Sequence, residues 1–117
     1  ASVGSSLGMK AWERLPENEY APLLRAIVER GPVAVSVAAE GWNSYASGVF
    51  DSCKKNAVID HAVTLLGYGH HRGQKFWIVQ NSWGPNWGMS GHIHLLRGES
   101  DDFHCGTDHQ PELGTGC

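Results

Sequence analysis

The spacing of apolar residues changes once along this chain, at Gly31-Pro32, and this change limits the folds that the chain can adopt. Before that point, apolar residues recur at the three- and four-residue intervals of a helix face over residues 22–30. Beyond it, Val33, Val35 and Val37 alternate with small residues, as in a strand with one buried face. The sequence therefore predicts a short amphipathic helix that is followed by β-structure.

Further strands are predicted in the second half of the chain. Residues 58–68 and 75–80 are rich in β-forming residues, and residues 91–97 alternate between apolar and polar. A glycine-containing stretch at 70–73 predicts a hairpin loop, and residues 82–90 predict a longer loop. One helix followed by several closely connected strands predicts an α+β fold that is mainly β. We expect an antiparallel, open barrel-like sheet with one helix packed on it.

Size and charge exclude several classes of protein. A chain of 117 residues predicts one domain, and its net charge of −3 offers no basic surface for nucleic acid. No apolar run approaches the roughly 20 residues that a membrane span needs. Residues 1–8 are small and polar, without the basic start and apolar stretch of a secretory signal. We expect them to form a leading loop or a trimmed end, from which a signal has been removed already.

Two segments carry residues that are typical of catalysis. The first is Asp60-His61-Ala62-Val63, followed by Gly67-Tyr68-Gly69, and the second is Asn81-Ser82-Trp83-Gly84, followed by Trp87-Gly88. Each would usually be structural if it stood alone, since Asn and Ser also favour turns. Together they resemble the histidine and asparagine motifs of the papain-like cysteine proteases, the cathepsin family. Gly31-Pro32-Val33 and Cys105-Gly106 match as well, and the resemblance covers residues 15–106.

The resemblance implies a role for each of these side chains. His61 would be the general base and acid, and Asn81 would orient its ring through the amide oxygen. Trp83 would shield that hydrogen bond from water, with Trp87 packed nearby. The predicted strands agree with this, because His61 opens one strand and Asn81 ends the next. A hairpin would bring the two side chains to one face.

The family's substrate pocket can also be carried over by position. The resemblance implies that Ser36 and Ala62 line the pocket for the substrate residue two places before the scissile bond. It places the floor of that pocket near Gln110, and Trp83 beside the leaving-group side. Residues 107–117 depart from the apolar strand that is usual in the family, so we expect a divergent tail here.

Three cysteines, Cys53, Cys105 and Cys117, make an odd number. The resemblance implies a Cys53–Cys105 disulfide, the alternative being two separate thiols. Cys117 is extra and would bond to another chain or a longer C-terminal segment, or stay reduced. No metal or cofactor is implied. His92 and His94 lie two apart on one strand, a geometry that could hold a metal, but the family has exposed polar residues there.

The segment around the family's nucleophile, a glutamine shortly before a Cys-Trp pair, has no match in this chain. Cys53 is followed by Lys54, and Cys105 by Gly106. The resemblance therefore covers only the C-terminal, barrel-like half. We expect residues 1–117 to form this right-hand domain of the papain-like fold, with 1–14 as its leading segment.

As part of a whole protein, such a domain implies hydrolysis of peptide bonds through an acyl-enzyme thioester. The implied partners are an N-terminal domain or chain that carries the nucleophilic cysteine, peptide or protein substrates, and cystatin-like or propeptide inhibitors. The chain alone should be inactive. The family implies a lysosomal, vacuolar or secreted protein. The alternative hypothesis is a non-catalytic homologue or an isolated domain with a binding or structural role.

Overall fold

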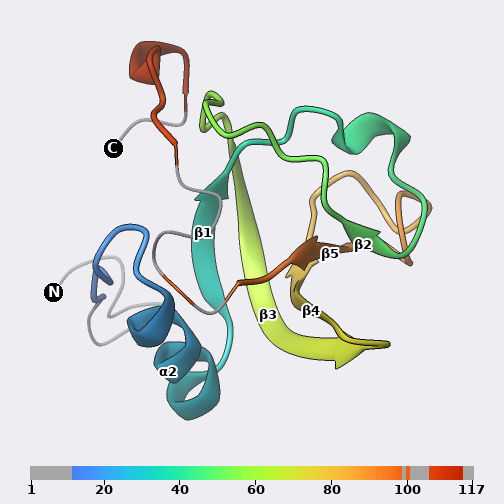
Figure 1. Cartoon of the computed structure of the whole chain (residues 1–117), viewed down its shortest axis with the longest axis horizontal. Helices are drawn as coiled ribbons and strands as arrows, with labels where there is room; N and C mark the ends of the chain where they lie inside the picture. Colours follow the sequence, from blue (N-terminus) through green and yellow to red (C-terminus); the bar gives the residue numbers. More distant parts are fainter. Residues whose placement is uncertain (1–11, 99, 101–105, 115–117) are drawn as a thin grey trace, which may run out of the picture.

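The strands of this chain form one curved sheet with the helix α2 against one end of it (Figure 1). The computed structural model describes residues 12–98, 100 and 106–114. Their elements are, in order, α2 (Tyr20–Arg30), β1 (Val33–Val37), η1 (Trp42–Ser44), β2 (Val49–Phe50), β3 (His61–His71), β4 (Gln74–Gln80), β5 (His92–Leu96) and η2 (Pro111–Leu113). The sheet order is β1-β3-β4-β5-β2, so β1 and β2 are its two edges and the barrel stays open. The predicted α+β, mainly β fold is confirmed.

The helix begins two residues earlier than the apolar pattern indicates, at Tyr20. Pro22 therefore lies in the first turn, where its missing N–H has no partner within the helix to lose. The helix ends at Arg30, and the backbone N–H of Gly31 donates to the carbonyl of Ile27 at 3.2 Å. Ile27 is buried and joins the core cluster, which fixes α2 to the sheet.

The β3–β4 hairpin is longer than the sequence predicts. His70 and His71, expected in the loop, still pair with Lys75 and Gln74. Only Arg72 and Gly73 form the turn, and both have positive φ, of 50° and 82°. Two-residue turns of this kind match the twist of the flanking strands, so the ladder continues up to the turn itself.

One strand pairing differs from the predicted antiparallel sheet. β2 pairs with β5 in parallel, with Val49 opposite His94 and Phe50 opposite Leu95. The other three pairings are antiparallel. Parallel neighbours need a long crossover, and here the whole β3–β4 hairpin lies between β2 and β5 in the sequence. The short β2 strand closes the edge of β5 and leaves the antiparallel frame unchanged.

The core lies on one face of the sheet around an indole. Trp42, in the short helix η1, and Ile93, in β5, are fully buried, and Val79 and Leu65 are nearly so. The remaining members of this cluster are Ile27, Tyr45 and Val63. Because Val79 pairs with both Leu65 and Ile93 across adjacent strands, the three central strands share one apolar stripe.

A buried cation joins the helix to the hairpin. The guanidinium of Arg97 donates to the hydroxyl of Tyr20 at 3.0 Å and to two backbone carbonyls of β3 and β4 at 3.4 Å. Its central carbon also lies over the rings of Tyr68 and Trp77, 5.2 and 5.5 Å from their centroids. Carbonyl oxygens and π faces therefore solvate this charge, as a buried cation requires.

Several predicted features fall outside the described residues. Cys105 and Cys117 are among them, so the Cys53–Cys105 disulfide stays a prediction. Most of the predicted leading segment, residues 1–14, is outside them too. Among the helices that are described, none is long and apolar enough to cross a membrane.

The indole N–H of Trp42 leads to a prediction about stability. It is buried and has no hydrogen-bond partner among the described residues. An unpaired buried donor costs about 1–3 kcal/mol. Trp42→Phe loses some ring contacts but also removes this donor, so the free energy of unfolding should change by only about 1 kcal/mol. Trp42→Ala should lose about 3–5 kcal/mol through the cavity it leaves. Urea unfolding measures both. Equal losses for the two variants would show that the N–H is paired.

His94 leads to a prediction about pH. Its ring stacks on Phe76, with centroids 4.3 Å apart. Burial lowers the pKa of His94 below its ordinary 6.5, and the charge of nearby His92 lowers it further. The unfolded chain therefore binds this proton first, and stability falls as the pH drops below about 6.5 toward the folded pKa. His94→Phe should flatten that fall, measured by denaturant unfolding between about pH 7.5 and 5. Identical slopes for both proteins would contradict the assignment.

Candidate active site

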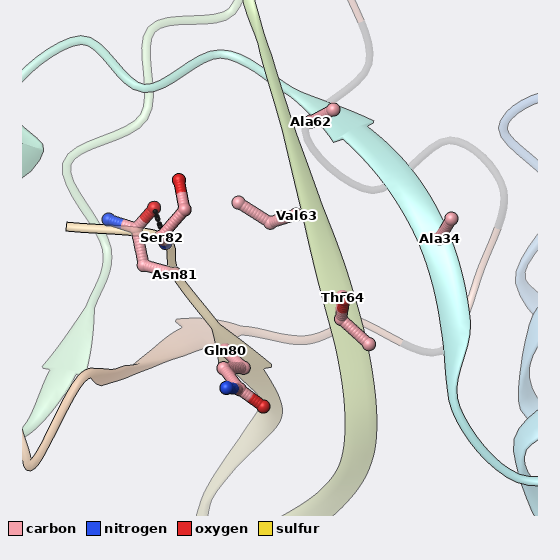
Figure 2. A pocket seen from close by; sticks show the side chains of 7 residues that line it. All are labelled: Ala34, Ala62, Val63, Thr64, Gln80, Asn81 and Ser82. Atoms are coloured by element: carbon pink, nitrogen blue, oxygen red, sulfur yellow. Dashed lines mark hydrogen bonds between the residues drawn. The ribbon is translucent and has the colours of Figure 1, made fainter. Parts of the chain in front are cut away.

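The pairing of β3 with β4 brings His61 and Asn81 into contact. His61 is the first residue of β3, Asn81 follows the last residue of β4, and Thr64 pairs with Gln80 between them. The Nε2 atom of His61 lies 2.6 Å from the Oδ1 atom of Asn81. The same oxygen accepts the backbone N–H of Ser82 at 2.8 Å, as Figure 2 shows. Because Oδ1 is thus an acceptor, Nε2 of His61 donates to it, and Nδ1 remains as the basic nitrogen.

Two indoles hold the imidazole of His61. The ring of Trp83 lies 5.2 Å from it, tilted by 34°, and the ring of Trp42 meets it edge-on at 6.0 Å. Asn81 is only 7% exposed, whereas Trp83 is 40% exposed and forms the outer cover. The His61–Asn81 hydrogen bond therefore lies between aromatic rings and away from water, where it is stronger than in solvent.

Trp87 supports this arrangement from behind. Its ring stacks on Trp42 at 6.1 Å, meets Trp83 at 5.2 Å, and its N–H donates to the carbonyl of Trp42 at 3.0 Å. Trp87 thus packs against the two indoles that contact His61. The sequence analysis gave Trp42 no role at the site. The available signal was a large apolar side chain in an otherwise small and polar segment. Such a side chain has to pack against residues that are distant in the sequence.

The loop that carries Trp83 and Trp87 folds back on the start of β5. The backbone N–H of Asn81 donates to the carbonyl of Gly91 at 3.0 Å, and that of Gly91 to Trp87 at 2.8 Å. Gly88 has a φ of 59°, and a Cβ there would lie 2.6 Å from the carbonyl oxygen of His92. A side chain at Gly88 would force the loop outward, so this glycine sets how closely the tryptophans approach the sheet.

The segment before His61 is fixed to β1. The backbone N–H of Asp60 donates to the carbonyl of Val37 at 3.1 Å, and the carboxylate of Asp60 accepts the N–H of Ala39 at 3.1 Å. His61 itself pairs with Val37 in the β1–β3 ladder. The backbone of His61 is therefore held from the edge strand while its ring is held from β4.

A shallow cavity of about 440 Å³ opens beside Asn81 (Figure 2). Its lining comes from β1, β3 and the end of β4, namely Ala34, Ala62, Val63, Thr64, Gln80, Asn81 and Ser82. Ser36 is exposed and pairs with Ala62, so the two side chains share a face. Gln110 is exposed before η2, outside this lining. The structure thus brings His61, Asn81 and Trp83 together, and Ala62 and Asn81 line one cavity. Ser36 and Gln110 lie outside that lining, and the substrate-binding roles of Ser36, Ala62 and Gln110 stay predictions.

His92 and His94, the two histidines on β5 whose spacing could hold a metal, contact a carbonyl oxygen and an aromatic ring. The Nδ1 atom of His92 lies 3.3 Å from the carbonyl oxygen of Met89, and His94 stacks on Phe76. Within the described part of the chain, no group of three His, Cys, Asp or Glu side chains could hold a metal ion.

Comparison with known proteins gives a consistent result. Residues 3–115 match the family model described as Papain family cysteine protease. Vignain from Ricinus communis is 44% identical over 93 residues, which are 76% of this chain and 25% of the relative. Bromelain from Ananas comosus, solved with the E64 inhibitor, is 39% identical with a TM-score of 0.66, over 75% of this chain and 41% of that chain.

A third relative is named as a procathepsin. The digestive procathepsin L 3 of Tenebrio molitor is 37% identical with a TM-score of 0.63, over 71% of this chain and 28% of that chain. The chain thus spans between 25% and 41% of the length of these three relatives. The matched residues, the sheet and the His61–Asn81 arrangement lead to one conclusion: this chain belongs to the papain family of cysteine proteases.

Proposed function

We propose that this chain is the histidine- and asparagine-bearing part of a papain-like cysteine peptidase whose nucleophilic cysteine comes from outside the chain. The observation that carries the proposal is the 2.6 Å contact of His61 with Asn81 beneath the indole of Trp83. A binding or structural domain has no need for a shielded, oriented imidazole. The same trio has a direct use in thiol catalysis.

The proposed chemistry follows from which nitrogen is occupied. Nε2 of His61 donates to Asn81, so Nδ1 takes the proton of the thiol and leaves a thiolate beside an imidazolium. The thiolate sulfur attacks the carbonyl carbon of the peptide. The C–N bond then breaks, the imidazolium proton passes to the leaving amine, and a thioester remains. Water attacks the thioester while His61 takes its proton, and the thiol is regenerated.

Two observations support a nucleophile outside the chain. None of the three cysteines stands in the family's Cys-Trp context, and the chain spans at most 41% of the three relatives compared above. Without a segment that carries the nucleophile, the chain should not cleave peptides.

The proposed substrates are peptides or proteins that lie across the exposed face beside His61. Ser36 and Ala62 would line the pocket for the residue two places before the scissile bond, with Gln110 at its floor. Trp83 would border the leaving-group side, since 40% of it is exposed. Cystatin-like proteins and propeptides would inhibit by covering the same face. We place the protein in a lysosome, a vacuole or the secreted space, where a Cys53–Cys105 disulfide would persist.

A thiol-directed epoxide distinguishes this proposal from the non-catalytic alternative. In the complete protein, the label should fall on a cysteine outside this chain, because only that thiol is activated by His61. His61→Ala should reduce the labelling rate by roughly 10²-fold, the lower end of a general base contribution. Mass spectrometry of tryptic peptides identifies the site. Absence of a labelled cysteine in the wild-type protein would favour a binding or structural role.

Asn81 offers a second prediction. Asn81→Ala removes the acceptor that orients the His61 ring, and kcat/KM on a fluorogenic peptide should fall by roughly 10²-fold. The matched control is Gln74→Ala, which removes an exposed amide at the turn end of β4. The control should keep wild-type activity. Equal activity of Asn81→Ala and the control would mean that His61 is oriented by something else.

A further inference from the structure

The tail of the described chain lies along the loop that precedes His61. We call residues 106–114 the tail strap. The backbone N–H of Thr107 donates to the side-chain oxygen of Asn56 at 2.9 Å. The backbone N–H of Ile59 donates to the Oδ2 atom of Asp108 at 3.1 Å. In Figure 1 this red segment stands beside the green loop above β1. Side-chain acceptors on each segment thus capture backbone donors on the other.

Asp108 is the central link of the tail strap. Its second oxygen, Oδ1, accepts the backbone N–H of Gln110 at 2.8 Å. One half-buried carboxylate therefore bonds to the loop with one oxygen and shapes the strap with the other. Hydrogen bonds to an ionised acceptor are about twice as strong as neutral ones, so this link is stronger than the Thr107–Asn56 contact.

Backbone contact at both ends sets how closely the tail strap lies. A Cβ at Gly106 would lie 1.5 Å from the carbonyl oxygen of Lys55, and one at Gly114 would lie 2.2 Å from that of Ile59. Neither position has room for a side chain. The strap therefore follows the loop from Lys55 to Ile59 at a separation that only glycine permits.

The loop before Ile59 runs along the surface. Every residue from 51 to 56 is exposed, and the Lys54–Glu40 ion pair is a surface pair of the kind that contributes little. Asp60, at the end of this loop, bonds to β1 and to Ala39 just after it. Ile59 and Asp60 are thus consecutive residues held from two sides, by the strap and by β1, directly before His61. Together they fix the direction in which the chain enters β3.

We propose that the tail strap positions His61, and that Asp108 is its positioning residue. This inference rests on the proposed function, and it assigns a role to a tail whose sequence departs from the family pattern. When Asp108 is lost, Ile59 is released and the first residue of β3 moves more freely. The imidazole is then less often aligned for proton transfer, since a displacement of about 1 Å can cost 10²-fold in rate.

The test compares Asp108→Ala with Glu112→Ala in the complete protein. Glu112 is an exposed acid in η2, so the control removes the same charge from the same strap. Asp108→Ala should speed hydrogen exchange of the Ile59 amide by roughly tenfold, the effect of one lost hydrogen bond. It should also lower kcat per titrated active site by roughly tenfold. The control should change neither.

Three further outcomes decide the inference. An unchanged kcat per titrated site, with a lower melting temperature alone, would show a purely structural strap and overturn the proposal. If Asp108→Ala does not fold, Asp108→Asn keeps one acceptor and should give an intermediate effect; a wild-type result would overturn it. If the wild-type protein lacks thiol-dependent activity, the proposed function fails. The role of the strap is then tested by the NMR signal of the His61 Nε2–H. Asp108→Ala should broaden this signal, and an unchanged signal would overturn the proposal.

Discussion

The antiparallel pairing of β3 with β4 is the constraint on which the rest of the site depends. In such a hairpin, the start of one strand lies beside the end of the next, and no other element has to move for them to meet. His61 and Asn81 occupy those two positions. Their 2.6 Å contact is therefore a consequence of register, and a slip of one residue would turn one side chain to the opposite face.

The tryptophans serve the core and the site together. Trp42 is fully buried among the core residues, and its ring also meets that of His61 edge-on. Trp83 covers the same imidazole from outside, and Trp87 links the two indoles. Protein interiors are packed densely enough to transmit small shifts. A change in the core beneath Trp42 would thus displace the His61 ring.

The outer face of the sheet suits a role as one wall of a larger structure. The shallow cavity beside Asn81 is lined mainly by small and polar side chains (Figure 2). This lining and the partial coverage of the relatives support the proposal that the opposite wall of the site lies on another segment.

The order of elements could be predicted from local patterns. The apolar period changes at Gly31-Pro32, and the structure has a helix before that point and a strand after it. The extension of the β3–β4 ladder to the Arg72-Gly73 turn could not, because a positive φ at an arginine is imposed by strand twist and not by its own preference. The parallel β2–β5 pairing was missed for a related reason, since Val49 and Phe50 are too few to show which neighbour they join.

By itself, the sequence identified the paired polar residues through the resemblance of their motifs to the papain-like family. Local spacing placed them at strand ends, because strand patterns depend on residues that are close along the chain. The tertiary structure alone decided that Trp42 packs on His61 and that Asp108 bonds to Ile59. The partners in each pair are 19 and 49 residues apart, and Trp42 and Asp108 lie in segments with no regular pattern. Only the folded arrangement of the sheet brings such segments together, so no local preference could have indicated the contacts.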